Sequence, residues 1–144
     1  MVSSKWLYNA WTISDTGKMK VLVVDDDEWI RELFREMLSG YDVVMAESDV
    51  KAVESFRREN PDVVLMDIVV GDMDGIEATR RILSENPKAA VFAVICFSET
   101  KGEEIIRAVA KEVISKPLKR SDLLSRVGKY AGGRPTQSAT GHVV

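Results

Sequence analysis

Four apolar runs of the sequence each end in side chains that suit phosphoryl chemistry. The runs cover residues 21–24, 63–66, 91–97 and 113–115, and they are followed by Asp25 with Asp26 and Asp27, by Asp67, by Ser98 and by Lys116. An unpaired carboxylate is unfavourable inside a buried strand. We therefore expect Asp67 to lie where its strand emerges from the core.

The carboxylates among these residues can hold a metal, and the hydroxyl and the ammonium can bind a phosphoryl group. Adjacent carboxylates raise the pKa of one of them unless a cation removes the repulsion. An all-oxygen set such as Asp25, Asp26 and Asp67 suits Mg²⁺, with Mn²⁺ as an alternative. Lys116 would supply an ammonium and Ser98 a hydroxyl, and a carboxylate can itself be the nucleophile that forms an aspartyl phosphate. The set predicts a phosphoryl-transfer site.

The segments between the apolar runs carry helical patterns. Residues 28–39 place Ile30, Leu33, Phe34, Met37 and Leu38 on one face, with Asp26 or Asp27 as the expected N-cap. Further helices are expected from residue 48 to 59, from 74 through 83, around 103–110 and from 121 to 130, with another strand at 43–46. This alternation predicts an α/β fold, a doubly wound five-stranded parallel sheet with helices on both faces. The carboxyl ends of such strands share one edge, which is where ligands bind.

Each of these residues also has an ordinary structural interpretation when it is taken alone. An acidic triplet after a strand is often a solvated turn and a helix cap, and Ser98 or a Lys-Pro pair is a common loop signal. Their shared position at the carboxyl ends of predicted strands favours one common site over coincidence.

Composition bounds the function classes. The chain has 144 residues, 30% of them charged, and a net charge of −3, which is typical of one soluble globular domain. The absence of a basic stripe disfavours direct nucleic-acid binding, no apolar run has the length for membrane insertion, and no signal peptide is evident.

The single cysteine, Cys96, lies in an apolar run and fits a core position and a cytoplasmic location. The sole histidine, His142, falls in the expected tail, so the chain is not expected to be its own phosphohistidine donor.

Three regions are predicted along the chain. Residues 1–18 form an N-terminal extension, residues 19–130 the folded domain, and residues 131–144 a polar tail that is expected to be disordered. Trp6, Leu7, Ala10 and Trp11 would share one face if the extension were helical. The extension is either an added segment or a docking or dimerisation arm.

From residue 19 to about 130, the chain resembles a response-regulator receiver domain of the chemotaxis-protein type. The matching pieces are residues 21–27, 62–68, 73–77, Ser98-Glu99 and Lys116-Pro117. The resemblance implies a flavodoxin-like fold in which Asp67 accepts a phosphoryl group from a phosphohistidine. The donor would be a sensor histidine kinase or a phosphotransfer protein.

The resemblance also implies individual roles at the site. Mg²⁺ would be held by Asp26, by Asp67, by the backbone carbonyl of Val69 and, through water, by Asp25. Lys116 would pair with the phosphoryl group and Ser98 would swing to it on activation. The chain would be a signalling switch with self-catalysed phosphorylation and dephosphorylation only, and its output would pass through an unnamed protein partner.

The chain departs from the family pattern at three places. Gly71 stands where the family usually has proline, and Val113 stands where it usually has an aromatic switch residue. The link at residues 108–112 before the last strand is unusually short. These departures leave phosphorylation expected and put the usual output mechanism in question.

Three other functions are consistent with parts of the pattern. A haloacid-dehalogenase-type phosphatase would use Asp25 as nucleophile and Asp27 as acid, although such enzymes usually have a longer chain and a cap. A flavin binder would need a Ser/Thr/Gly phosphate loop after the first strand, where this chain has acids. A phosphorylation-independent interaction module would be expected to lose the acidic pair or the lysine, and both are present.

Overall fold

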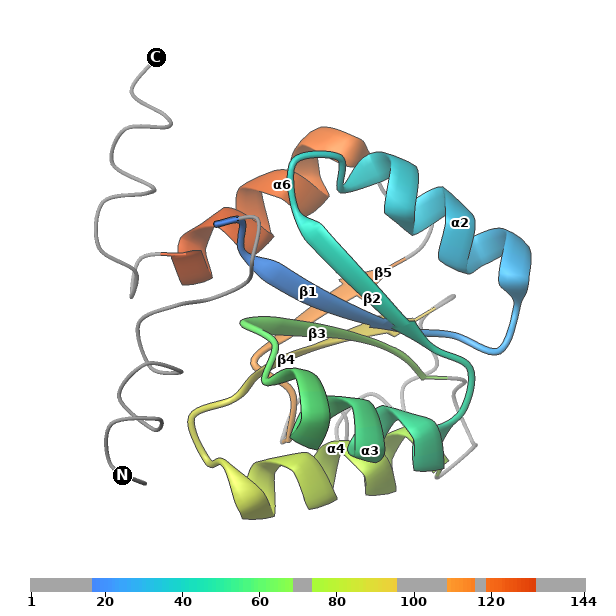
Figure 1. Cartoon of the computed structure of the whole chain (residues 1–144), viewed down its shortest axis with the longest axis vertical. Coiled ribbons are helices and arrows are strands. Elements are labelled where there is room, and N and C mark those ends of the chain that lie inside the picture. The colour runs from blue at the N-terminus through green and yellow to red at the C-terminus, as the bar shows by residue number, and fades with distance from the viewer. Residues whose placement is uncertain (1–16, 69–73, 96–108, 116–118, 132–144) are drawn as a thin grey trace.

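The structure is a computed structural model that describes residues 17–68, 74–95, 109–115 and 119–131 (Figure 1). Five strands form one sheet in the order β2-β1-β3-β4-β5, and all pairs are parallel. The strands are β1 (Lys20–Val24), β2 (Asp42–Ala46), β3 (Val63–Ile68), β4 (Ala90–Ile95) and β5 (Glu112–Ser115). The predicted fold class is confirmed.

Helices cover both faces of the sheet. Figure 1 shows α3 (Asp49–Glu59) and α4 (Asp74–Glu85) on one face and α2 (Glu28–Met37) and α6 (Arg120–Gly128) on the other. A short 3-10 turn, η1 (Lys129–Ala131), follows α6. The helix expected around 103–110 lies outside the described residues except at its end. The extension at 1–18 and the tail at 131–144 also lie almost wholly outside them.

Two apolar clusters form because strand side chains alternate between the faces. Leu22 and Val24 of β1 pack with the cluster under α3 and α4, whereas Val21 and Val23 pack with the cluster under α2 and α6. Strands β3 and β4 alternate in the same way and are buried on both sides. The core therefore lies in two layers, one on each side of the sheet.

Local signals set the helix boundaries. The carboxylate of Asp27 accepts the N–H of Trp29 at 2.9 Å and caps α2, so Asp27 rather than Asp26 is the N-cap. The hydroxyl of Ser48 accepts the N–H of Lys51 at 3.1 Å and caps α3. Helix α3 ends at Asn60, whose φ of 49° is left-handed, directly before Pro61. These caps place the N-termini of α2 and α3 beside the ends of β1 and β2.

Candidate functional site

The turn between β1 and α2 holds two of the predicted carboxylates. Asp25 is 4% exposed and Asp26 is exposed. One carboxylate oxygen of Asp25 accepts the N–H of Asp27 at 2.9 Å, and the N–H of Asp25 donates to the carbonyl of Ala46 at 3.1 Å. The guanidinium of Arg31 donates to the carbonyl of Asp25 at 2.7 Å. The turn is thus held from β2 and from α2.

The third carboxylate comes from the neighbouring strand. Asp67 is half-buried on β3 and is in register with Val94 of β4. The strand continues for one residue beyond it, so Asp67 lies near the strand's end rather than after it. Gly75 in the first turn of α4 lies against this end, because a Cβ at that position would be 3.1 Å from the carbonyl oxygen of Asp67. The close approach of α4 to β3 favours glycine there, because a Cβ would force its neighbours to shift.

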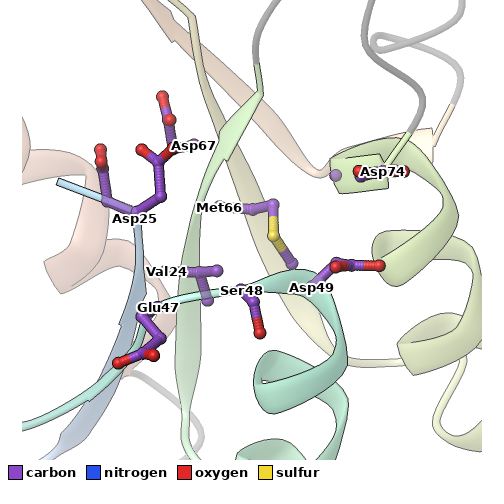
Figure 2. Close-up of a pocket in the computed structure, with 10 residues that line it drawn as sticks. Val24, Asp25, Glu47, Ser48, Asp49, Met66, Asp67 and Asp74 are labelled. Carbon is purple, nitrogen blue, oxygen red and sulfur yellow. The ribbon is translucent and has the colours of Figure 1, made fainter.

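The three carboxylates meet at the carboxyl edge of the sheet. One oxygen from each of Asp25, Asp26 and Asp67 lies within 4.8 Å of the others. Figure 2 shows Asp25 directly after β1 and Asp67 on the neighbouring strand β3, with their side chains pointing to the same side. Hard oxygen donors at this spacing, one of them buried, suit a small divalent cation such as Mg²⁺ or Mn²⁺. The donor set therefore fits the metal that the sequence predicted.

An acidic pocket extends from this cluster toward α3 and α4 (Figure 2). It has a volume of about 230 Å³, and six carboxylates line it, those of Asp25, Asp26, Glu47, Asp49, Asp67 and Asp74. The first turns of α3 and α4 both border it, and backbone N–H groups at helix starts favour negative charge. The pocket can accept a cation together with a phosphoryl group attached to one of its acids.

The structure brings together only part of the predicted site. Asp25, Asp26 and Asp67 converge as expected, whereas Val69, Gly71, Ser98 and Lys116 lie outside the described residues. Val113 is half-buried on β5 and packs against the apolar cluster under α3 and α4. Its carbonyl accepts the guanidinium of Arg126 at 3.2 Å. The position where the sequence resemblance predicts an aromatic residue is thus held by a small, half-buried side chain.

Sequence reasoning missed two residues that shape the site, Arg31 and Gly75. Arg31 follows the cap Asp27 by one helical turn, a spacing at which side chains lie back over the preceding turn. Gly75 is an unfavourable residue type inside a predicted helix. Both signals were available in the sequence, but neither indicates which backbone atom is contacted.

Comparisons with known proteins agree with this geometry. A model described as response regulator receiver domain matches residues 21–128. The chain is similar to the chemotaxis protein CheY of Halobacterium salinarum, with 36% identity over 113 residues that cover 75% of this chain and 92% of that protein. It is also similar to CheY of Bacillus subtilis, with 32% identity over 116 residues that cover 76% and 95% of the two chains.

A solved structure shares the fold and is described with a metal in place. It is the receiver domain of a sensor histidine kinase from Pseudomonas aeruginosa, with a magnesium ion coordinated in its active site cleft. The TM-score is 0.72 and the identity 26%, over 80% of this chain and 98% of that one.

One further relative is much longer than this chain. A cyclic di-GMP phosphodiesterase of Thermotoga maritima is 39% identical over 103 residues, which are 69% of this chain and 27% of that protein. The chain therefore spans about a quarter of that relative, and the name describes the longer protein.

Among the described residues, no helix is long and apolar enough to cross a membrane.

Proposed function

The chain belongs to the response regulator receiver domain family, and on that premise we propose that it is a phospho-acceptor switch of a two-component system. The observation that carries the proposal is the convergence of Asp25, Asp26 and Asp67, with oxygens within 4.8 Å of one another, at the carboxyl edge of the sheet. The same edge is where open parallel sheets bind ligands.

Asp67 is proposed as the acceptor. One of its carboxylate oxygens attacks the phosphorus of a phosphohistidine, so that an O–P bond forms and the N–P bond breaks. The electron pair of the broken bond stays on the imidazole nitrogen, and the product is an aspartyl phosphate. The position of Asp67 near the end of β3, half-buried and beside the pocket, supports this role.

Asp25, Asp26 and Asp67 are proposed to hold Mg²⁺, together with the backbone carbonyl of Val69. When bound, this ion would neutralise the charge of the carboxylates and of the incoming phosphoryl oxygens. Support comes from the oxygen-only donor set and from the Pseudomonas aeruginosa receiver domain, which is described with magnesium in its cleft. Mn²⁺ is the expected substitute.

Ser98 and Lys116 are proposed to bind the phosphoryl group, in keeping with the family resemblance. The phosphodonor would be a sensor histidine kinase or a phosphotransfer protein, and the output would pass to another protein in the cytoplasm. At Val113, a stiff β-branched side chain cannot make the large rotamer change of an aromatic switch. We expect its methyl groups to keep their rotamer on phosphorylation.

Phosphorylation with a small acyl phosphate tests the proposal. The wild-type chain, Asp67→Ala and Asp42→Asn are incubated with the phosphodonor, with and without Mg²⁺. The mass of each intact protein is then measured by mass spectrometry. We expect one added phosphoryl group on the wild type and on Asp42→Asn, which changes an acid at the opposite edge, only when Mg²⁺ is present. Asp67→Ala should stay unlabelled.

The outcomes separate the alternatives. Equal labelling of Asp67→Ala and the wild type would refute the acceptor assignment. A wild type that binds protein partners but is never labelled would favour the phosphorylation-independent module. Continuous turnover of a phosphoester by the wild type but not by Asp25→Asn would favour the phosphatase.

A further inference from the structure

Arg31 forms two hydrogen bonds to the turn that carries Asp25 and Asp26. Its guanidinium donates to the carbonyl of Asp25 at 2.7 Å, and its backbone N–H donates to the carbonyl of Asp27 at 3.0 Å. Asp27 in turn donates its N–H to the carboxylate of Asp25 at 2.9 Å. Arg31 is partly buried, so this bond is partly shielded from water.

The guanidinium acts on the backbone rather than on a carboxylate. Among the described residues, Arg31 forms no ion pair, although several acids lie nearby in sequence. A direct ion pair with Asp25 or Asp26 would occupy the oxygens that a metal needs. A bond to the carbonyl instead orders the turn without placing the guanidinium on a carboxylate oxygen.

We infer that Arg31 is a positioning residue for the metal-binding acids, an inference that rests on the proposed function. Because the peptide bond is planar, fixing the carbonyl of Asp25 also fixes the N–H of Asp26 and the direction in which that residue leaves the turn. Mutation of a residue that supports a metal ligand from the outer shell typically lowers the metal affinity by about 10- to 100-fold. The charge of the guanidinium makes its bond to the carbonyl stronger than a neutral one.

Arg35 offers a matched control on the same helix. It lies one turn further along α2, where its side chain is 53% exposed and faces Glu32 at 3.5 Å and the sulfur of Met45 at 4.0 Å. Removal of either guanidinium changes the net charge equally. Only Arg31 contacts the acidic turn.

The first measurement is the dissociation constant of Mg²⁺, obtained by calorimetry on wild type, Arg31→Met, Arg31→Lys and Arg35→Met. We expect Arg31→Met to weaken Mg²⁺ binding by about tenfold and Arg35→Met to stay close to the wild type. Arg31→Lys keeps a charged donor on a side chain shorter by one atom, so it should recover part of the loss. Unchanged or tighter binding by Arg31→Met, or no recovery with lysine, would overturn the inference.

The second measurement needs no metal. Amide hydrogen exchange in metal-free buffer reports on the N–H groups of Asp27 and Trp29, which bind the carboxylates of Asp25 and Asp27. We expect faster exchange at both amides in Arg31→Met but not in Arg35→Met, and equal exchange in the two variants would refute the positioning role. A wild type that fails to bind Mg²⁺ refutes the proposed function instead, while this arm still reports on the turn.

Discussion

The carboxylates at the two edges of the sheet have different surroundings. At the amino edge, Glu59 binds the ammonium of Lys20 at 2.9 Å, and Glu112 binds the guanidinium of Arg126 at 3.1 Å and the hydroxyl of Tyr130 at 3.3 Å. At the carboxyl edge, Asp25, Asp26 and Asp67 are instead gathered within 4.8 Å of one another.

The difference separates acids that stabilise the fold from acids that serve a ligand. An acid bonded to a cation contributes to stability, whereas acids held near one another repel in the metal-free chain. Active sites commonly carry such locally unfavourable arrangements at some cost in stability. Removal of an acid should therefore lower stability at the amino edge, whereas at the carboxyl edge it should relieve repulsion in the metal-free chain and impair the phosphoryl chemistry.

The largest stability effect is expected at Glu112, which joins β5 to the end of α6. Its side chain is 17% exposed, and Glu112→Ala would remove the carboxylate that accepts from both Arg126 and Tyr130, leaving Arg126 only the carbonyl of Val113. Because charged hydrogen bonds contribute roughly 1.5–3 kcal/mol, we expect the free energy of unfolding to fall by about 2 kcal/mol. Urea denaturation measures this, and labelling of the folded protein should be unchanged.

The control for Glu112 is Glu32→Ala in α2. Glu32 faces Arg35 at 3.5 Å with both side chains more than half exposed, so its loss should change stability by less than about 0.5 kcal/mol. A Glu112→Ala chain as stable as Glu32→Ala, or one that loses labelling while folded, would contradict the assignment of Glu112 to the fold alone.

Two glycines give the next contrast, one at each edge. A Cβ on Gly75 would lie 3.0 Å from Cγ1 of Ile68 and 3.1 Å from the carbonyl oxygen of Asp67, whereas a Cβ on Gly128 would meet nothing within 4 Å. Gly128→Ala should stabilise the chain by about 0.5–1 kcal/mol, because alanine is the better helix former. Gly75→Ala should lose that gain, destabilise the chain by about 1 kcal/mol and slow phosphorylation.

Thermal or urea unfolding of both glycine variants, together with the initial rate of labelling, measures the contrast. Equal stabilisation by both substitutions, with an unchanged labelling rate for Gly75→Ala, would show that the end of β3 shifts to accommodate the added methyl group at little cost. The position of Asp67 would then not depend on the close approach of α4.

The fold was predictable because each strand and helix carries its own local signal. The apolar runs gave the strands, and the cap residues Asp27 and Ser48 gave the helix starts. The convergence of Asp25 and Asp67 followed from the geometry of parallel strands, although they are 42 positions apart in the sequence. Topology thus converts a local pattern into a shared site.

The contacts that support the site were not predictable in the same way. Residue type and spacing suggest that Arg31 lies over the turn before it, but a guanidinium can bind a carboxylate, a carbonyl or water. The closeness of Gly75 to Asp67 depends on how α4 packs against β3, which no local pattern specifies. The predicted roles of Ser98, Lys116 and Val69 stay predictions, since they fall outside the described residues.

A smaller effect is expected at Asp26, the exposed member of the acidic group. Two charges about 4 Å apart repel by about 1 kcal/mol in water, so Asp26→Asn should stabilise the metal-free chain by up to about 1 kcal/mol at low salt. In Mg²⁺ at 100 times its dissociation constant, the wild type should gain about 2.7 kcal/mol and the variant less. Urea denaturation with and without Mg²⁺ measures both, with Asp42→Asn as the control at the other edge.

A stabilisation of Asp26→Asn that persists unchanged in Mg²⁺ would contradict the proposed ligand role of Asp26. A destabilised variant in metal-free buffer would contradict the repulsion itself.

The smallest effect is the pH dependence contributed by Glu59 at the amino edge. Hydrogen bonds from Lys20, and then from Arg58, hold the pKa of Glu59 below its ordinary value of 4.5. The folded state therefore binds the proton less readily than the unfolded state does. The stability from this pairing is fully present above pH 4.5 and is lost as the pH falls through the lowered pKa. Because the side chain of Glu59 is 25% exposed, we expect the pairing to contribute about 0.2–1 kcal/mol to the free energy of unfolding.

Glu59→Gln isolates this contribution in urea denaturation at several pH values from 7 to 3. The variant should be less stable than the wild type at pH 7, and the two should converge as the pH falls, because both then carry a neutral group at this position. The exposed residue Glu36 provides the control, since Glu36→Gln removes the same charge from a carboxylate with no ion pair among the described residues. A wild-type advantage over Glu59→Gln that stays constant to pH 3 would show that Glu59 stabilises the fold through packing of its side chain, and that the pairing with Lys20 contributes nothing measurable.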